Sequence, residues 1–374
     1  NHEDYFAKIG DDHKFPINKF GELANYLIKK KIVKEFHTPY PCSEETLKKA
    51  HSESYIKKVK NKTLDKNIIK KIGFPLVDSV IQRSLVATGG TVLASKLAIN
   101  NGVACNTAGG SHHANFEGGA GYCVFNDVAV AAYYLLDRGL AGRILILDLD
   151  VHQGNGSAEI FKNNNNVFTF SMHSKSNYPA KKSISDLDVE LDDDLEDAQY
   201  IKILKFYLDK LNEENFDYVF YIAGVDIHFN DRLGKLKISD DGIRKRDEIV
   251  TENFFSKGVP LCGVLGGGYN KDFDKLVELH SFLHQSCAKL LWLMSKKNPN
   301  LTAEQKLVMF EDGTEPPGTS ELNNEKRNGS YHCANCGIKL FESETKYESG
   351  SGWPSFFQSL PDVFETKTDH LLGY

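Results

Sequence analysis

The sequence lacks several features that would place the protein in a specialised class. It has no uninterrupted apolar run of about 18 residues, so we expect no segment to span a membrane. It has no basic excess, because 45 Lys and Arg against 51 Asp and Glu give a formal net charge of −6; we therefore expect no nucleic-acid partner. Its first residues, from Asn1 to Tyr5, have neither the basic start nor the apolar core of a signal peptide.

Cysteine usage indicates a reducing environment. The seven cysteines are odd in number and widely scattered, which is not the pattern of a secreted domain held together by disulfides. The 41% hydrophobic and 26% charged residues are typical of a soluble globular chain. We therefore expect a cytoplasmic protein.

The 374 residues show two textures, which predicts one large and one small domain. Up to residue 297, short apolar runs alternate with helix-like stretches at 20–31, 79–100, 127–138, 197–212 and 276–297. This alternation predicts an α/β fold with an open parallel sheet and helices on both faces. Residues 301–374 are richer in turn residues and aromatics, which predicts a small, mostly β segment. The predicted domains are therefore 1–297 and 298–374.

A polar or glycine-rich loop follows every apolar run of the large domain. In open parallel sheets, ligands bind beyond the carboxyl ends of the strands, because the loops converge there. One such loop could occur by chance, but five loops at the same edge of the sheet predict a functional site. The five apolar runs are 103–105, 143–147, 167–170, 218–222 and 261–265.

Three residues in these loops have the chemistry and spacing of metal ligands. Alternate residues of an extended segment face the same side, so Asp150 and His152 can reach one ion. Asp226, which follows another strand, is the natural third ligand. Two carboxylates and an imidazole suit zinc or a similar divalent metal, and three protein ligands leave a position open for water. We predict a catalytic metal site.

Further polar residues surround this predicted site. Asp148 can support a neighbouring imidazole, and His112 and His113 follow two glycines that let the backbone approach closely. A neutral imidazole there would be a general base, and Tyr269 could donate to a developing oxyanion. Each motif alone is more often part of an ordinary turn or loop. Their occurrence together, each at the end of a strand, indicates a functional site. We interpret four other residues as ordinary loop or helix residues: His228, Asp231, His280 and His284.

Several motifs occur in one order within residues 5–297. They are Gly109-Gly-Ser-His-His-Ala114, Gly121-Tyr-Cys-Val-Phe-Asn-Asp127, Asp148-Leu-Asp-Val-His-Gln-Gly-Asn-Gly156, Gly224-Val-Asp226 with Asp231-Arg-Leu-Gly234, and Gly266-Gly-Gly-Tyr269. Together they resemble the histone deacetylase superfamily. The opening His13-Lys-Phe-Pro-Ile-Asn-Lys-Phe20 and Asn155 are most similar to its class IV and bacterial members. The resemblance implies the arginase–deacetylase fold and zinc-dependent hydrolysis of the amide of an Nε-acyl-lysine, with acetyl or a longer acyl group.

The resemblance also assigns individual roles. It implies zinc bound by Asp150, His152 and Asp226, His113 as general base and acid, and His112 as a companion oriented by Asp148. Tyr269 would polarise the acyl carbonyl. The substrate-binding residues would be Tyr122 and Tyr178, which wall a narrow tunnel, with Gly121, Gly267 and Gly268. A potassium ion would lie near Asp148, Asp150, His152 and Ser171.

One departure from the family pattern concerns the partner of His113. Many members have Asp where this chain has Asn155, and an amide orients the imidazole but stabilises its cation less than a carboxylate does. A binuclear arginase is not expected, because Gln153, Ile227 and His228 stand where bridging carboxylates would be needed. Two alternatives stay open: an acetylpolyamine deacylase, and a non-catalytic module that binds acyl-lysine.

The C-terminal segment carries Cys333 and Cys336, a CxxC pair that is half of a four-cysteine zinc site. A redox pair or two ordinary thiols are the alternatives. With Trp353 and the flanking motifs, residues 301–374 resemble the B-type methionine-R-sulfoxide reductases. No second CxxC and no nucleophilic Cys follow before Tyr374. We therefore expect the segment, as given, not to reduce methionine sulfoxide, whether it is a piece of a longer fusion or a decayed domain.

Overall fold

A computed structural model describes residues 1–10, 13–295, 298–311, 313–361 and 363–364 of the chain. The contacts divide it into two compact units, Asn1–Leu291 and Trp292–Tyr374. The last two residues of the predicted helix 276–297, which adjoin the predicted domain boundary, lie outside the described residues. We keep 1–297 and 298–374 as proposed domain limits, because α10 (Phe273–Ser295) is one continuous helix across the division.

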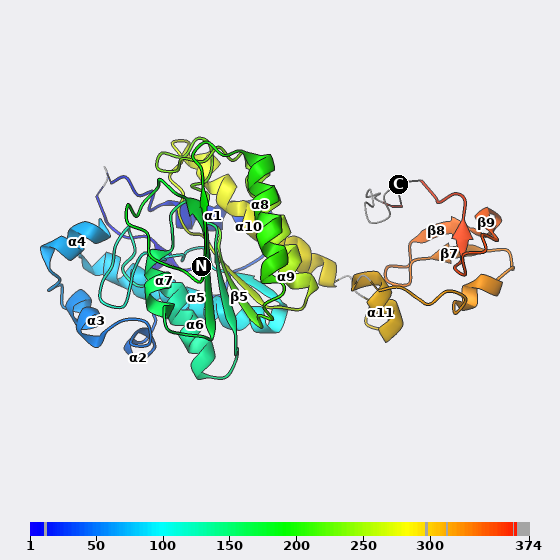
Figure 1. Ribbon diagram of the computed structural model, residues 1–374, viewed down its shortest axis with the longest axis horizontal. Coiled ribbons are helices and arrows are strands. Elements are labelled where there is room, and N and C mark those ends of the chain that lie inside the picture. The colour runs from blue at the N-terminus through cyan, green and yellow to red at the C-terminus, as the bar shows by residue number, and fades with distance from the viewer. Residues whose placement is uncertain (11–12, 296–297, 312, 362, 365–374) are drawn as a thin grey trace. The chain divides into compact units, whose positions relative to one another are not determined.

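The large unit contains an open sheet flanked by helices (Figure 1). Within the part of the chain that the structure describes, this sheet has six parallel strands in the order β1-β6-β5-β2-β3-β4. The predicted α/β fold is therefore confirmed. The sequence did not predict β4, a short edge strand with alternating burial. The bounds are β1 Val103–Cys105, β2 Ile144–Asp148, β3 Val167–Ser174, β4 Leu187–Leu191, β5 Tyr218–Ile222 and β6 Leu261–Val264.

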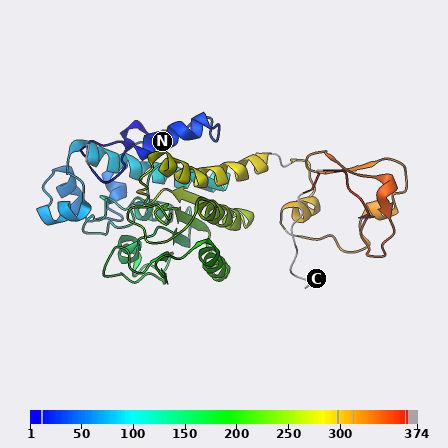
Figure 2. The same cartoon turned by 90° about the horizontal axis from the view of Figure 1, so that it is seen from above.

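Helices bury both faces of this sheet, as the two views in Figures 1 and 2 show. Alternate residues of β2 face opposite sides: Ile144 and Ile146 join the core with α5 and α6, whereas Leu145 and Leu147 join the core with α8, α9 and α10. The helices are α1 Lys19–Lys29, α2 Glu44–Leu47, α3 Glu53–Lys60, α4 Lys66–Ile72, α5 Asp78–Asn101, α6 Asp127–Asp137, α7 Asn155–Phe161, α8 Asp197–Leu211, α9 Asp240–Ser256 and α10. No described helix is both long and apolar enough to cross a membrane.

The small unit is built from short antiparallel pairs, as the sequence predicts. β7 (Ser330–His332) pairs with β8 (Lys339–Glu342), and β9 (Lys346–Tyr347) pairs with β10 (Ser355–Phe356). One helix, α11 (Ala303–Phe310), begins with a capping box in which Thr302 and Gln305 satisfy each other's backbone N–H groups. Among the described residues of this unit, Leu301 alone is buried.

Candidate active site

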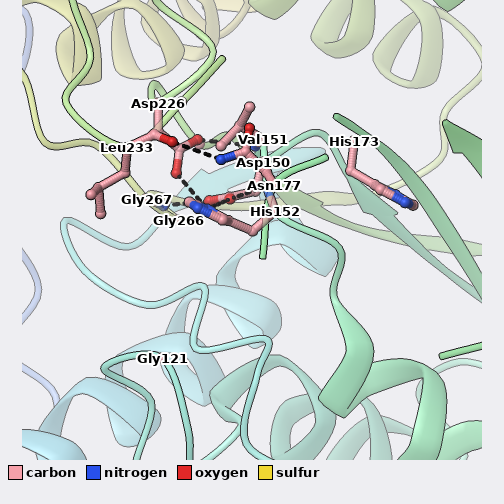
Figure 3. Close-up of polar contacts among 12 residues, drawn as sticks. Gly121, Asp150, Val151, His152, His173, Asn177, Asp226, Leu233, Gly266 and Gly267 are labelled. Carbon is pink, nitrogen blue, oxygen red and sulfur yellow. Dashed lines mark hydrogen bonds and ion pairs between the residues drawn. The ribbon is translucent and has the colours of Figure 1, made fainter. Parts of the chain in front are cut away.

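The three predicted metal ligands converge at the carboxyl edge of the sheet. β2 and β5 are neighbours, so the residues that follow them meet: Asp150 and His152 after β2, and Asp226 after β5. One ligand atom from each lies within 4.8 Å of the others, and Figure 3 shows the three side chains pointing toward one another. Asp150 and Asp226 are fully buried, and His152 is 8% exposed.

Backbone N–H groups hold the two carboxylates in place. Gly267 N donates to Asp150 Oδ2 at 2.6 Å, and Val151 N donates to Asp226 Oδ1 at 3.0 Å. A Cβ at Gly267 would lie 2.0 Å from Asp226 Oδ2, so only glycine fits this close approach. The sites of both carboxylates are thus fixed by the fold itself.

The charges of this cluster favour a cation. Burial and the neighbouring charge of Asp150 raise the pKa of Asp226 to about 7. Burial disfavours the protonated form of His152, but its hydrogen bonds to Asp150 and Asp226, both 3.1 Å from Nδ1, outweigh it and raise the pKa of His152 to about 10. Burial opposes ionisation of Asp150, but the charge of His112 and the hydrogen bonds and charge of His152 outweigh it and hold the pKa of Asp150 well below its usual range. A divalent cation could take the place of the proton between the two carboxylates, and the donor set suits zinc.

The two adjacent histidines are set by a glycine turn. Gly109 and Gly110 both have positive φ, and the Asp127 carboxylate accepts from Gly110 N and Ser111 N. This turn presents His112 and His113, whose ring centroids are 4.1 Å apart. The histidine pair is therefore positioned by the first residue of α6.

Each histidine has a different partner. His112 Nδ1 lies 2.6 Å from Asp148 Oδ2, and His113 Nδ1 lies 2.7 Å from Asn155 Oδ1. Burial opposes protonation of His112, but the charges of Asp148 and Asp150 outweigh it and raise its pKa to about 9. Burial and the charge of His112 lower the pKa of His113 well below 6.5. A cationic His112 beside a neutral His113 is what a companion and a general base require.

Tyr269 is presented by the glycine loop after β6 and is 7% exposed. Its backbone N donates to Asp231 Oδ2 at 2.6 Å, and its carbonyl accepts from Arg232 Nε at 2.7 Å. Sequence reasoning treated Asp231 as an ordinary loop residue, whereas its carboxylate also caps Leu233 N and Gly234 N. Asp231 therefore anchors the turn that carries the tyrosine.

Sequence reasoning also missed Lys19, the first residue of α1. Its Nζ lies 3.3 Å from Gly266 O, 3.5 Å from Gly268 O and 3.3 Å from His280 Nε2, and the residue is 1% exposed. Burial lowers the pKa of Lys19 to about 8. His280, which the sequence left as an ordinary helix residue, is thus part of the support of the glycine loop.

Two tyrosine rings pack against residues of the site. The Tyr178 ring meets His113 edge-on with centroids 4.9 Å apart, and Tyr122 packs 6.0 Å from the Tyr269 ring. Gly121 has positive φ, and a Cβ there would lie 2.4 Å from His113 Cδ2. The pocket, of about 30 Å³, is lined by His112 and His113 and by Asp150, Tyr122 and Tyr269. It has room for a small group only.

Ser171, the remaining residue of the predicted potassium site, lies beside Asp148 in the register of β2 and β3. Ser171 Oγ is paired with His173 Nδ1 at 2.9 Å, and Figure 3 places His173 away from the metal ligands. The potassium site stays a prediction. In the small unit, Cys333 is half-buried and Cys336 exposed, in the turn between β7 and β8. Partial burial opposes ionisation of Cys333, but the N–H groups of Cys336 and Asn335 outweigh it and lower its pKa.

The fold and this edge define an α/β domain with a candidate metal site at the carboxyl ends of its strands, and comparisons with known proteins specify the class. The family model of the histone deacetylase domain matches residues 13–281, and that of the SelR domain matches residues 301–374. The chain belongs to the histone deacetylase family, and its large unit is a deacetylase-type hydrolase domain.

Individual relatives agree with this assignment. An uncharacterized protein of Picosynechococcus sp. is 43% identical over 288 residues, which are 76% of this chain and 96% of that protein. Histone deacetylase 2 of Arabidopsis thaliana is 33% identical over 73% of each chain. A solved HDAC homolog complexed with SAHA matches with a TM-score of 0.64 and 25% identity, over 77% of this chain and 83% of that chain. The HDA15 HD domain, at 20% identity and a TM-score of 0.59 over 75% of this chain and 85% of that chain, shares the fold.

Proposed function

We propose that the large unit hydrolyses the amide of Nε-acyl-lysine, with a zinc ion held by Asp150, His152 and Asp226. The observation that carries the proposal is the convergence of these three buried ligands beside two histidines of opposite protonation preference and a buried tyrosine. Zinc bound there would supply Lewis-acid activation of water and of the acyl carbonyl.

The chain's own residues would handle the proton and the developing charge. His113, kept neutral and oriented by Asn155, would accept a proton from the attacking water at Nε2 and return it to the leaving lysine amine. His112, held by Asp148, would keep a positive charge beside it. The Tyr269 hydroxyl would donate to the oxyanion.

The shape of the pocket supports a narrow, linear substrate. Tyr122 and Tyr178 would enclose the methylene stem of a lysine, with Gly121 at the wall and the loop of Gly267 and Gly268 at the inner end. The small volume of this pocket, about 30 Å³, favours an acetyl group over a long acyl chain. The SAHA complex of the structural relative agrees with an acyl-lysine-like ligand.

The test is release of free amine from a series of acyl-lysine peptides by metal-loaded protein, with a chelated sample as control. Turnover that falls steeply beyond acetyl and disappears with chelator is the expected result. If acetylated polyamines turn over and no peptide does, the substrate assignment is wrong. If metal binds and no acylated amine of either kind turns over, the large unit is a binding module instead.

A further inference from the structure

Two cysteine sulfurs meet in the large unit, outside the catalytic pocket. Cys105 at the end of β1 donates to Cys287 on α10, with the Sγ atoms 3.3 Å apart. The residues are 182 positions apart in the sequence, so tertiary packing makes the contact. We propose that Cys105 and Cys287 form a reversible disulfide when the protein meets a hydroperoxide, which makes this pair a redox modification site.

The packing around the pair allows the two sulfurs to approach. On β6, Gly263 pairs with Cys105, and a Cβ there would lie 3.1 Å from Cys105 Sγ and 2.9 Å from Leu283 Cδ2 of α10. Because Gly263 has no side chain, α10 and the end of β1 can contact each other at this position. A disulfide bond of about 2.05 Å requires the sulfurs to close by about 1 Å, which side-chain rotation and a small helix shift can supply.

A cavity gives an oxidant access to the pair. Both cysteines line a cavity of about 440 Å³, much larger than the catalytic pocket, and its wall includes the exposed side chains of Lys34 and Glu35. Solvent and a small peroxide can therefore reach the sulfurs. Cys262 on the neighbouring strand is fully buried and is not part of this wall, so it offers an internal comparison.

The two thiols would have different roles. Cys105 is half-buried, whereas Cys287 is 5% exposed, and the contact between the two thiols together with burial raises the pKa of Cys287 well above its usual value. The more accessible Cys105 releases its proton and, as thiolate, attacks one oxygen of hydrogen peroxide; the O–O bond breaks, a sulfenic acid forms, and the departing hydroxide takes up the released proton and leaves as one water. The Cys287 sulfur then attacks the Cys105 sulfur, its proton leaves with the hydroxide, and a second water is released. Two thiols and one peroxide thus give one disulfide and two waters.

The bond would tie together two segments that lead to the active site. β1 runs into the turn that presents His112 and His113, and α10 follows the loop that ends at Tyr269. Cross-linking them closes a loop of 182 residues and restricts the unfolded chain, so the oxidised protein should melt at a higher temperature.

The experiment uses the full chain carrying Cys333→Ser and Cys336→Ser, so that the CxxC pair does not take part. The protein is treated with hydrogen peroxide, remaining thiols are alkylated, and the digest is analysed by mass spectrometry with and without dithiothreitol. Cys105→Ser and Cys287→Ser are tested in the same background, and Cys42→Ser, another half-buried cysteine, serves as the matched control.

The expected result is a cross-linked peptide pair containing Cys105 and Cys287. The mass of this pair should be two hydrogens below the sum of the two peptides, and dithiothreitol should break the cross-link. The oxidised protein should also have a higher melting temperature. Cys42→Ser should retain it, and both pair variants should lose it. Free Cys287 beside Cys105 oxidised to sulfinic acid would overturn the proposal, and so would two thiols that stay free while Cys42 or Cys123 is oxidised.

Discussion

The two candidate metal sites of this chain are built in opposite ways. In the large unit, three ligands are buried, and backbone donors from distant segments already hold both carboxylates. In the small unit, Cys333 and Cys336 lie in a surface turn, and Leu301 is the one described residue there that is buried. The difference teaches that the first site is a product of the fold, whereas the second resembles sites in which bound metal supplies folding energy.

Removal of a buried ligand should have the largest effect among the tests of the difference between the two candidate metal sites. Asp226→Ala should abolish both metal binding to the large unit and amide hydrolysis, because two ligands no longer close the site. Metal content and turnover are measured together. As the matched control, Cys333→Ser with Cys336→Ser should leave hydrolysis unchanged, and a parallel loss of activity in that variant would contradict the separation of the two sites.

The next effect separates metal binding from catalysis. Tyr269→Phe should retain the metal but lower kcat by on the order of 10²-fold, as removal of one oxyanion donor does. The ring fills the same space, so the loop anchored by Asp231 should be unchanged. Full activity in this variant would show that the hydroxyl has no catalytic role.

A smaller effect concerns the partner of the general base. Asn155→Asp places a carboxylate 2.7 Å from His113 Nδ1 and should raise the pKa of His113 by about 1 unit or more. A base must be neutral to act. As the pH is lowered, activity should therefore be lost at a higher pH in Asn155→Asp than in the unchanged protein. The pH profile of kcat/KM measures this shift. An acid limb at the same pH in both proteins would remove His113 from the base role.

The last prediction concerns stability rather than activity, and it compares one histidine of each unit. Burial lowers the pKa of His51 to about 4 and outweighs the hydrogen bond to Asn115 O, which opposes the shift. The other ring nitrogen accepts from Asn126 N in the core, so it has no room for a proton. Between about pH 6.5 and pH 4, His51 binds a proton in the unfolded state but not in the folded state. Its contribution to the free energy of unfolding is therefore fully present above about pH 6.5 and is lost as the pH falls toward 4. From pH 7 to 5 this residue should remove about 2 kcal/mol, given about 1.36 kcal/mol per pKa unit.

Urea unfolding of the large unit at both pH values measures this contribution. His51→Gln should flatten the dependence, although its stability at pH 7 will also fall because one hydrogen bond is lost. The exposed His332 of the small unit is the matched control, and His332→Gln should leave the dependence unchanged. An equal slope in the His51 variant and the unchanged protein would refute the assignment.

Most of the sheet and the centre of the site could be predicted from the sequence. Buried parallel strands are continuous apolar runs, and the polar residues after them must meet at one edge. The edge strand β4 could not be predicted, because Asp188 and Glu190 interrupt its apolar residues and one of its sides is unpaired. Asp231 and Lys19 were missed for another reason, because their roles depend on contacts with the loop after β6. Gly266 of that loop is 247 positions away from Lys19 in the sequence. Such partners carry no local pattern.

The close approach at Gly267 has a consequence for interpreting related genomes. Any side chain there would overlap the Asp226 carboxylate, since even a Cβ would lie 2.0 Å from Oδ2. A duplicated gene could therefore keep Asp150, His152 and Asp226 intact and still lose its metal site through one substitution at a residue that binds nothing by its own side chain. Surveys that look for inactive copies by ligand identity alone would count such a copy as active, whereas adding this glycine to the criterion would identify it.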